Sequence, residues 1–97
     1  MFYVYILKTA SKNKSFYIGF APDLKARLSK HANGLVKSTK HLRPLGLLYY
    51  EAYTSKRDAL IREKRLKKFA KGFASLKGRI ENSLLNPLPL LEGKESI

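Results

Sequence analysis

The chain has 97 residues, which is the size of one domain and leaves no room for separate catalytic and regulatory lobes. Its 20 Lys and Arg against 7 Asp and Glu give a formal net charge of +13 and a pI near 10.2. This charge favours a polyanionic partner, because neutralised phosphates release counterions; a solubilising surface or a ribosome-associated protein is the alternative. The absence of cysteine excludes disulfide frameworks, Cys-ligated zinc and thiol nucleophiles.

Hydropathy argues against a targeting or membrane segment. With 44% hydrophobic residues, most of the chain should pack into a core. The opening MFYVYILK has no basic residue before its short apolar run, and no apolar stretch approaches the roughly 20 residues of a membrane span. We therefore expect a packed, cytoplasmic domain with no membrane partner.

The first 20 residues predict a β-hairpin. Residues 2–8, FYVYILK, are aromatic and β-branched with apolar residues on both faces, which is typical of a central strand. Residues 9–14, TASKNK, have turn chemistry, and residues 15–20, SFYIGF, form the second strand. Gly19 interrupts that strand, and a glycine there permits a close approach or an unusual φ.

A helix is predicted next, with Asp23 in its first turn and the NG pair at 33–34 as its stop. Arg27 and His31 are four residues apart and therefore project from one face of this helix. Residues 35–46 read as a cationic loop, and LLYYEAY at 47–53 as a third strand.

Two further helices complete the expected domain. One begins at Ser55 and runs to about Ala70, with Asp58 forming a pair like a capping box, and the other spans about 74–85 with apolar residues at a period of four. These elements predict an α/β (α+β) fold over residues 1–85, with a small central three-stranded antiparallel sheet flanked by helices. Residues 86–97, NPLPLLEGKESI, read as a loosely attached or disordered tail.

Glu63 is the candidate residue with the strongest chemical signal. It lies on the apolar stripe of the second helix, where an unpaired charge is costly to bury. A divalent cation is one candidate partner. A salt bridge to Arg62, Lys67 or Arg27 is the other, and spacing alone favours the salt bridge.

Four more residues have both a structural and a chemical interpretation. Tyr5 and Tyr17 lie on neighbouring strands, either as core residues or as phenols that position a water near a metal. Arg27 is either a surface residue or a bidentate phosphate ligand. His31 could be a proton donor, a phosphate contact or a solvent-facing residue, and spacing does not select among these roles.

The basic helix and the cationic loop predict a nucleic-acid-binding surface. The candidate contacts are the cations of these two segments: Lys37, Lys40, Arg43, Arg62, Lys64, Lys67 and Lys68.

The order of these motifs resembles the GIY-YIG nuclease domain. YVY at 3–5, YIG at 17–19, KARLSKH, RPLGLLYYE and ALIREKRLKK follow one another as they do in that family, over roughly residues 2–80. The match is especially close to small stand-alone bacterial proteins related to the N-terminal nuclease domain of the bacterial excinuclease. Tyr3 is a departure, since it stands where the family's first motif has a glycine.

The resemblance implies a divalent-metal-dependent DNA endonuclease that hydrolyses phosphodiester bonds in DNA repair, recombination or processing. Gly19 matches the motif glycine, Glu63 the ligand of one Mg²⁺ or Mn²⁺, and Arg27 the residue at the scissile phosphate. The implied catalytic residues are Tyr5, Tyr17, Arg27, His31 and Glu63. The small size favours structure-selective cleavage or low sequence specificity. The alternatives are a non-catalytic module that binds DNA or RNA, and a structural protein with an acidic protein partner.

Overall fold

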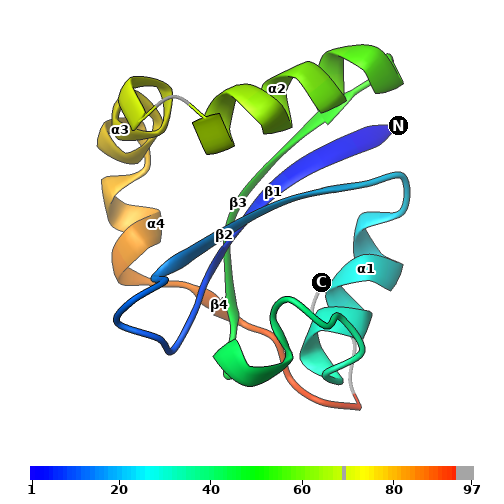
Figure 1. Ribbon diagram of the computed structural model, residues 1–97, viewed down its shortest axis with the longest axis vertical. Helices are drawn as coiled ribbons and strands as arrows, with labels where there is room; N and C mark the ends of the chain where they lie inside the picture. Colours follow the sequence, from blue (N-terminus) through cyan, green and yellow to red (C-terminus); the bar gives the residue numbers. More distant parts are fainter. Residues whose placement is uncertain (69, 94–97) are drawn as a thin grey trace.

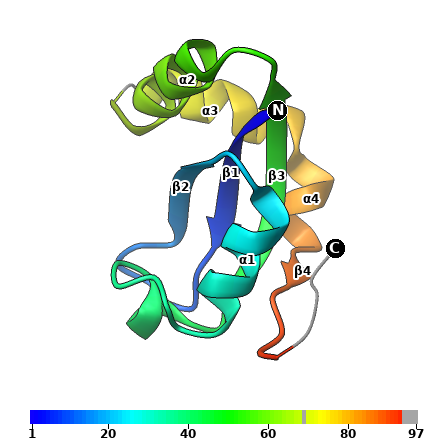
Figure 2. The same cartoon turned by 90° about the vertical axis from the view of Figure 1, so that its right-hand side faces the viewer.

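A computed structural model describes residues 1–68 and 70–93 of the chain. A four-stranded antiparallel sheet in the order β2-β1-β3-β4 has helices on both faces (Figures 1 and 2). The strands are β1 Phe2–Lys8, β2 Phe16–Ala21, β3 Gly46–Tyr53 and β4 Leu88–Pro89. The helices are α1 Leu24–Ala32, the 3₁₀ turn η1 Lys40–Leu42, α2 Lys56–Lys68, α3 Ala70–Arg79 and α4 Glu81–Leu85.

The central strand β1 divides the core in two. Successive side chains of a strand point to opposite faces, so Tyr5 and Leu7 pack with α1 while Val4 and Ile6 pack with the other helices. All four side chains are buried, as a strand with two apolar faces requires. The expected fold of a central antiparallel sheet flanked by helices is therefore confirmed, with one strand more than the three predicted.

Local signals place α1 where the sequence predicts it. The Asp23 side chain caps the helix by accepting a hydrogen bond from the Ala26 N–H at 3.1 Å. Gly34 ends it with a φ of +72°, and the Arg43 guanidinium packs against this glycine. Arg43 also donates to the carbonyl oxygens of Lys40 and Ala32, so it closes the C-terminal end of α1.

The last predicted helix, 74–85, is two helices in the structure. α3 ends at Arg79 and α4 begins at Glu81, because Ile80 between them has φ −120° and ψ 32°. Leu76, Ile80 and Leu84 still pack on the same apolar cluster. The period of four therefore identified the buried side chains correctly but not the bend in the backbone.

The segment after α4 differs from the loosely attached tail that its composition predicts. β4 pairs with β3, opposing Leu88 to Leu47, and Leu90 is buried in the α1-side core. The Leu90 N–H donates to the Leu45 carbonyl at 3.0 Å. The pairing of Leu88 and the burial of Leu90 therefore attach this segment to the domain despite its prolines. Residues 94–97 of the predicted tail lie outside the described part of the chain. No described helix is long and apolar enough to span a membrane.

Candidate active site

Four of the five predicted catalytic residues meet between the sheet and α1. Tyr5 is fully buried in the middle of β1, and Tyr17 is half-buried on the edge strand β2 with its ring centroid 6.3 Å from that of Tyr5. The ring of His31, from α1, lies 5.5 Å from the Tyr5 centroid and 5.2 Å from the Tyr17 centroid. Arg27 comes from the same helix, one turn earlier.

Gly19 makes room for this cluster. It is the β2 partner of Tyr5 in the antiparallel register, and a Cβ placed on it would lie 2.4 Å from the Tyr5 ring. The requirement is one of space, since the positive φ angles of the described glycines are at Gly34 and Gly93. The close approach that the sequence predicts at Gly19 is therefore made by the aromatic side chain of the neighbouring strand.

His31 is held by two buried hydrogen bonds. Its Nε2 lies 2.6 Å from the Tyr5 hydroxyl, and its Nδ1 lies 2.8 Å from Thr39 Oγ1. Because the Thr39 hydroxyl faces the Val36 carbonyl as its own acceptor, we assign Nδ1–H as the donor to Thr39 and Nε2 as the acceptor of the Tyr5 proton.

Burial and, to a lesser degree, the charge of Arg27 lower the pKa of His31 to about 4. The imidazole is therefore neutral at pH 7. With no part of its side chain exposed, His31 does not face solvent, so that one of its three expected roles is wrong. His31 lies on the inner face of α1, where Tyr5 and Thr39 cover its ring.

Arg27 lies against both tyrosines. Its contact with the Tyr5 hydroxyl raises the pKa of the guanidinium above its ordinary value, and Tyr17 acts in the same direction. Burial raises the pKa of Tyr5, the Arg27 contact opposes that shift, and the charge of Glu63 adds to it. The Nε of Arg27 is buried without a hydrogen-bond partner in the described part of the chain. An unsatisfied buried donor is costly, and such donors gather at functional sites.

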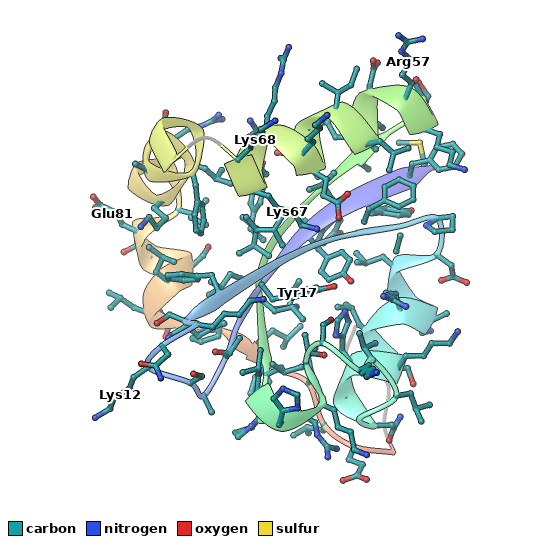
Figure 3. All side chains as sticks on the ribbon, viewed as in Figure 1. Lys12, Tyr17, Arg57, Lys67, Lys68 and Glu81 are labelled. Atoms are coloured by element: carbon teal, nitrogen blue, oxygen red, sulfur yellow. The ribbon has the colours of Figure 1, made fainter. Side chains whose placement is uncertain are left out.

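Glu63 completes the site from α2. Its side chain is 19% exposed, and its Oε2 lies 3.1 Å from Lys67 Nζ one turn later. Lys67 is thus the ion-pair partner among the three that the spacing offered. Figure 3 shows Lys67 directed from α2 toward β2, the strand that carries Tyr17. The helix α2 that carries Glu63 packs against β1 and β2, the strands of Tyr5 and Tyr17, and the charge of Glu63 contributes weakly to the raised pKa of Tyr5.

The donor set fits a metal ion that is shared with a substrate. In the described residues, no three His, Cys, Asp or Glu side chains come together to hold an ion by themselves. A partly exposed Glu63 offers one carboxylate, which is how Mg²⁺ is usually held, with waters and substrate phosphate oxygens as its other ligands.

The predicted nucleic-acid contacts divide into two groups. Arg43 closes the end of α1, and Arg62 pairs with Glu51, with its Nε 2.6 Å from Oε1. These two guanidinium groups are therefore engaged within the domain. The others are lysines with exposed side chains: Lys37, Lys40, Lys64, Lys67 and Lys68.

Two residues near the site are absent from the sequence-based predictions. Thr39 orients His31 from a loop without periodicity, so the sequence did not predict it. Lys30 lines an open hollow of about 230 Å³ together with Arg27 and Phe20. Its position three residues after Arg27 on the same helix face was the signal that could have identified it.

Comparison with known proteins agrees with this geometry. The model of the GIY-YIG catalytic domain matches residues 1–72. A UPF0213 protein of Staphylococcus epidermidis is 44% identical over 70 residues, which cover 71% of this chain and 83% of the relative. A UPF0213 protein of Staphylococcus saprophyticus is 43% identical over the same coverage of each chain.

A solved structure is also similar. The solution NMR structure of a UPF0213 protein from Bacillus halodurans has 34% sequence identity and a TM-score of 0.50, covering 87% of this chain and 94% of that one. With a family model that covers most of the sequence and a site assembled from its motifs, the chain belongs to the GIY-YIG catalytic domain family, a family of nucleases.

Proposed function

We propose that the protein is a divalent-metal-dependent endonuclease that hydrolyses phosphodiester bonds in DNA. The observation that carries this proposal is the meeting of four side chains from three elements, Tyr5 of β1, Tyr17 of β2, and Arg27 and His31 of α1. Glu63 lies on α2, which packs against both of these strands. A tyrosine pair, a guanidinium and a carboxylate together suit attack by water on a phosphodiester, since each has a separate task in that reaction.

Arg27 binds the scissile phosphate. Its guanidinium lies beside the tyrosine hydroxyls and keeps its charge at every physiological pH. Charge builds up on the phosphate oxygens in the transition state, and a fixed cation stabilises that charge more than it stabilises the ground state.

The two tyrosines have different tasks. Tyr5 is fully buried and donates to His31, so it positions Arg27 and His31 and does not reach solvent. Tyr17 is half-buried, and its hydroxyl orients the attacking water. His31 is a positioning residue by the same reasoning, since Tyr5 separates it from the substrate.

Glu63 would hold the Mg²⁺ or Mn²⁺ ion. The ion supplies Lewis-acid polarisation of the phosphate and lowers the pKa of a bound water. Without the metal ion, Lys67 pairs with Glu63. When the carboxylate holds the metal ion, the exposed ammonium of Lys67 turns to a DNA phosphate. Exposed lysines on α2 and after α1 extend the contact along the DNA backbone, or along RNA, without reading base edges.

This contact pattern favours structure-selective cleavage or low sequence specificity. The resemblance to the bacterial excinuclease supports a setting in DNA repair, recombination or processing in the cytoplasm.

The test is cleavage of end-labelled linear, nicked, flap and branched DNA with Mg²⁺ or Mn²⁺. We expect the wild type to cleave, and Glu63→Gln and Arg27→Ala to lose the activity while they still melt cooperatively. Equal activity in all three proteins would identify a contaminating nuclease. Salt-sensitive binding without metal-dependent cleavage of any substrate would instead support the alternative, a non-catalytic module that binds DNA or RNA.

A further inference from the structure

Two neighbouring aliphatic residues on α2 face outward. Leu60 and Ile61 are each 40% exposed, whereas Ala59 and Leu66 of the same helix are buried against the sheet. The exposed pair lines a hollow of about 430 Å³ whose other walls are three cations: Lys56, Arg57 and Lys64. Neither residue belongs to the two apolar core clusters of the described chain, and the pair lies among cations of this basic helix.

The pair adjoins the candidate active site. Leu60 stands three residues before Glu63, four before Lys64 and seven before Lys67, and these intervals place all four on one face of a helix. The rise from Leu60 to Glu63 is about 4.5 Å along the helix axis. A substrate bound at Glu63 therefore extends over Leu60.

Charge and size select the occupant of this face. A second copy of the chain would bring two molecules of net charge +13 together through their cations. A stable protein partner needs about 800 Å² of surface on each side, and two aliphatic side chains form too small a centre for it. DNA fits both the cations and the aliphatic pair of this face, because phosphates neutralise the cations and an aliphatic side chain inserts between base pairs.

We propose that Leu60, supported by Ile61, is a wedge that enters the minor groove of DNA and unstacks one base step next to the scissile phosphate. Lys56, Arg57 and Lys64 hold the phosphates on either side of that step. Figure 3 shows Arg57 projecting from α2 away from the sheet, as a flanking phosphate contact requires. This inference rests on the proposed function for its substrate class, DNA.

The wedge also explains which DNA is preferred. Unstacking costs a few kcal/mol per step in intact duplex and less at a nick or mismatch, where stacking is already weakened. Substrates with such a defect therefore bind more tightly and are cleaved faster than intact duplex.

The test measures unstacking without cleavage. The full chain carrying Glu63→Gln binds a duplex with 2-aminopurine at successive steps, and fluorescence reports the step that opens. We expect one position to brighten several-fold with Leu60 present and to stay quenched with Leu60→Ala. Leu60→Lys is a second variant, which strengthens general binding by its charge but also leaves the step stacked. Leu85→Ala is the matched control, since Leu85 is 78% exposed on α4.

Affinity gives a second readout. Leu60→Ala should weaken binding to a nicked or mismatched duplex about tenfold, and binding to intact duplex by less than threefold, because in intact duplex the cost of unstacking offsets most of what the wedge contributes. Unchanged fluorescence, together with affinities of Leu60→Ala for both DNAs that equal those of the wild type, would overturn the wedge.

The wedge and the proposed function fail separately. Unstacking that depends on Leu60, in a wild type that cleaves nothing, supports the wedge and overturns the nuclease. Full cleavage of intact and nicked duplex by Leu60→Ala in the wild-type background supports the nuclease and overturns the wedge. A wild type that binds no DNA overturns both.

Discussion

The two halves of the candidate site are built in different ways. The half from α1 is locked, since His31 is fully buried between the Tyr5 hydroxyl and Thr39. The half from α2 is open, since within the described residues Glu63 pairs with Lys67, whose side chain is 52% exposed. One half is fixed by folding, and the other can exchange its partner when a metal and DNA arrive.

The difference divides the work of catalysis. A guanidinium that must match a transition state gains from a fixed position, because no reorganisation is then needed during the reaction. A metal ligand that shares its ion with the substrate gains from accessibility. Variants in the α1 half should therefore affect folding and activity together, whereas variants in the α2 half should affect activity alone.

The largest expected effect is on the open half. Glu63→Gln keeps the shape of the side chain but removes the charge, so metal-dependent cleavage should fall by about a thousandfold, the upper range for a lost electrostatic contact. The melting temperature should change little, since Glu63→Gln keeps the volume of the side chain and the lysine that pairs with the carboxylate is 52% exposed. Gel-based cleavage rates and thermal melts measure the two quantities. A large fall in the melting temperature of Glu63→Gln would show that the Glu63 carboxylate stabilises the fold.

The next effect is on the locked half. Gly19→Ala places a methyl group 2.4 Å from the Tyr5 ring, so the ring or the strand must shift. Overpacking of this kind costs about 3 kcal/mol of unfolding free energy, which urea denaturation measures. Gly72→Ala is the matched control, because a Cβ at Gly72 meets no other atom within 4 Å. Equal stability of both variants would mean that Tyr5 does not lie on Gly19.

The buried imidazole predicts a pH dependence in the same half. His31 has a pKa of about 4 in the folded protein, below its ordinary value near 6.5, so the unfolded chain binds a proton more readily. Stability from this group is present above pH 6.5 and is lost as the pH falls toward 4. The loss approaches roughly 3 kcal/mol, at about 1.4 kcal/mol for each pKa unit.

Urea denaturation from pH 7 to pH 4 tests this dependence. His31→Gln should lack the part of the decline that belongs to the imidazole, whatever its stability at pH 7. His41→Gln should keep the wild-type decline, because His41 is exposed. Parallel pH profiles for wild type and His31→Gln would contradict a buried, neutral His31.

The same division separates what the sequence revealed from what it did not. Aromatic and β-branched composition predicted the strands, and Asp23 with the NG pair at 33–34 predicted the ends of α1, since these signals are local; in the structure Asp23 is the N-cap. The tail was misjudged because Leu90 packs against residues far away in the chain, and proline content does not report such contacts.

Within the site, sequence spacing left the role of each residue open. The sequence does not say whether His31 lies on the outer or the inner face of α1, because this depends on how the helix packs against Tyr5. The hydrogen bond from His31 to Thr39 and the pairing of Arg62 with Glu51 likewise depend on how distant parts of the chain pack together. Arg62 was therefore assigned to nucleic acid by its charge, although it serves as an anchor between α2 and β3.

The smallest expected effect returns to the open half. Lys67→Met removes the ammonium that lies 3.1 Å from the Glu63 carboxylate, and because the Lys67 side chain is 52% exposed, stability should change by only about 0.5 kcal/mol. Without this competing cation, Glu63 should bind Mn²⁺ a few-fold more tightly in the DNA-free protein, as titration followed by electron paramagnetic resonance measures. Lys68→Met keeps the Glu63 pair and should leave this affinity unchanged. Weaker Mn²⁺ binding by Lys67→Met would show that Lys67 orients the carboxylate for the metal and does not compete with it.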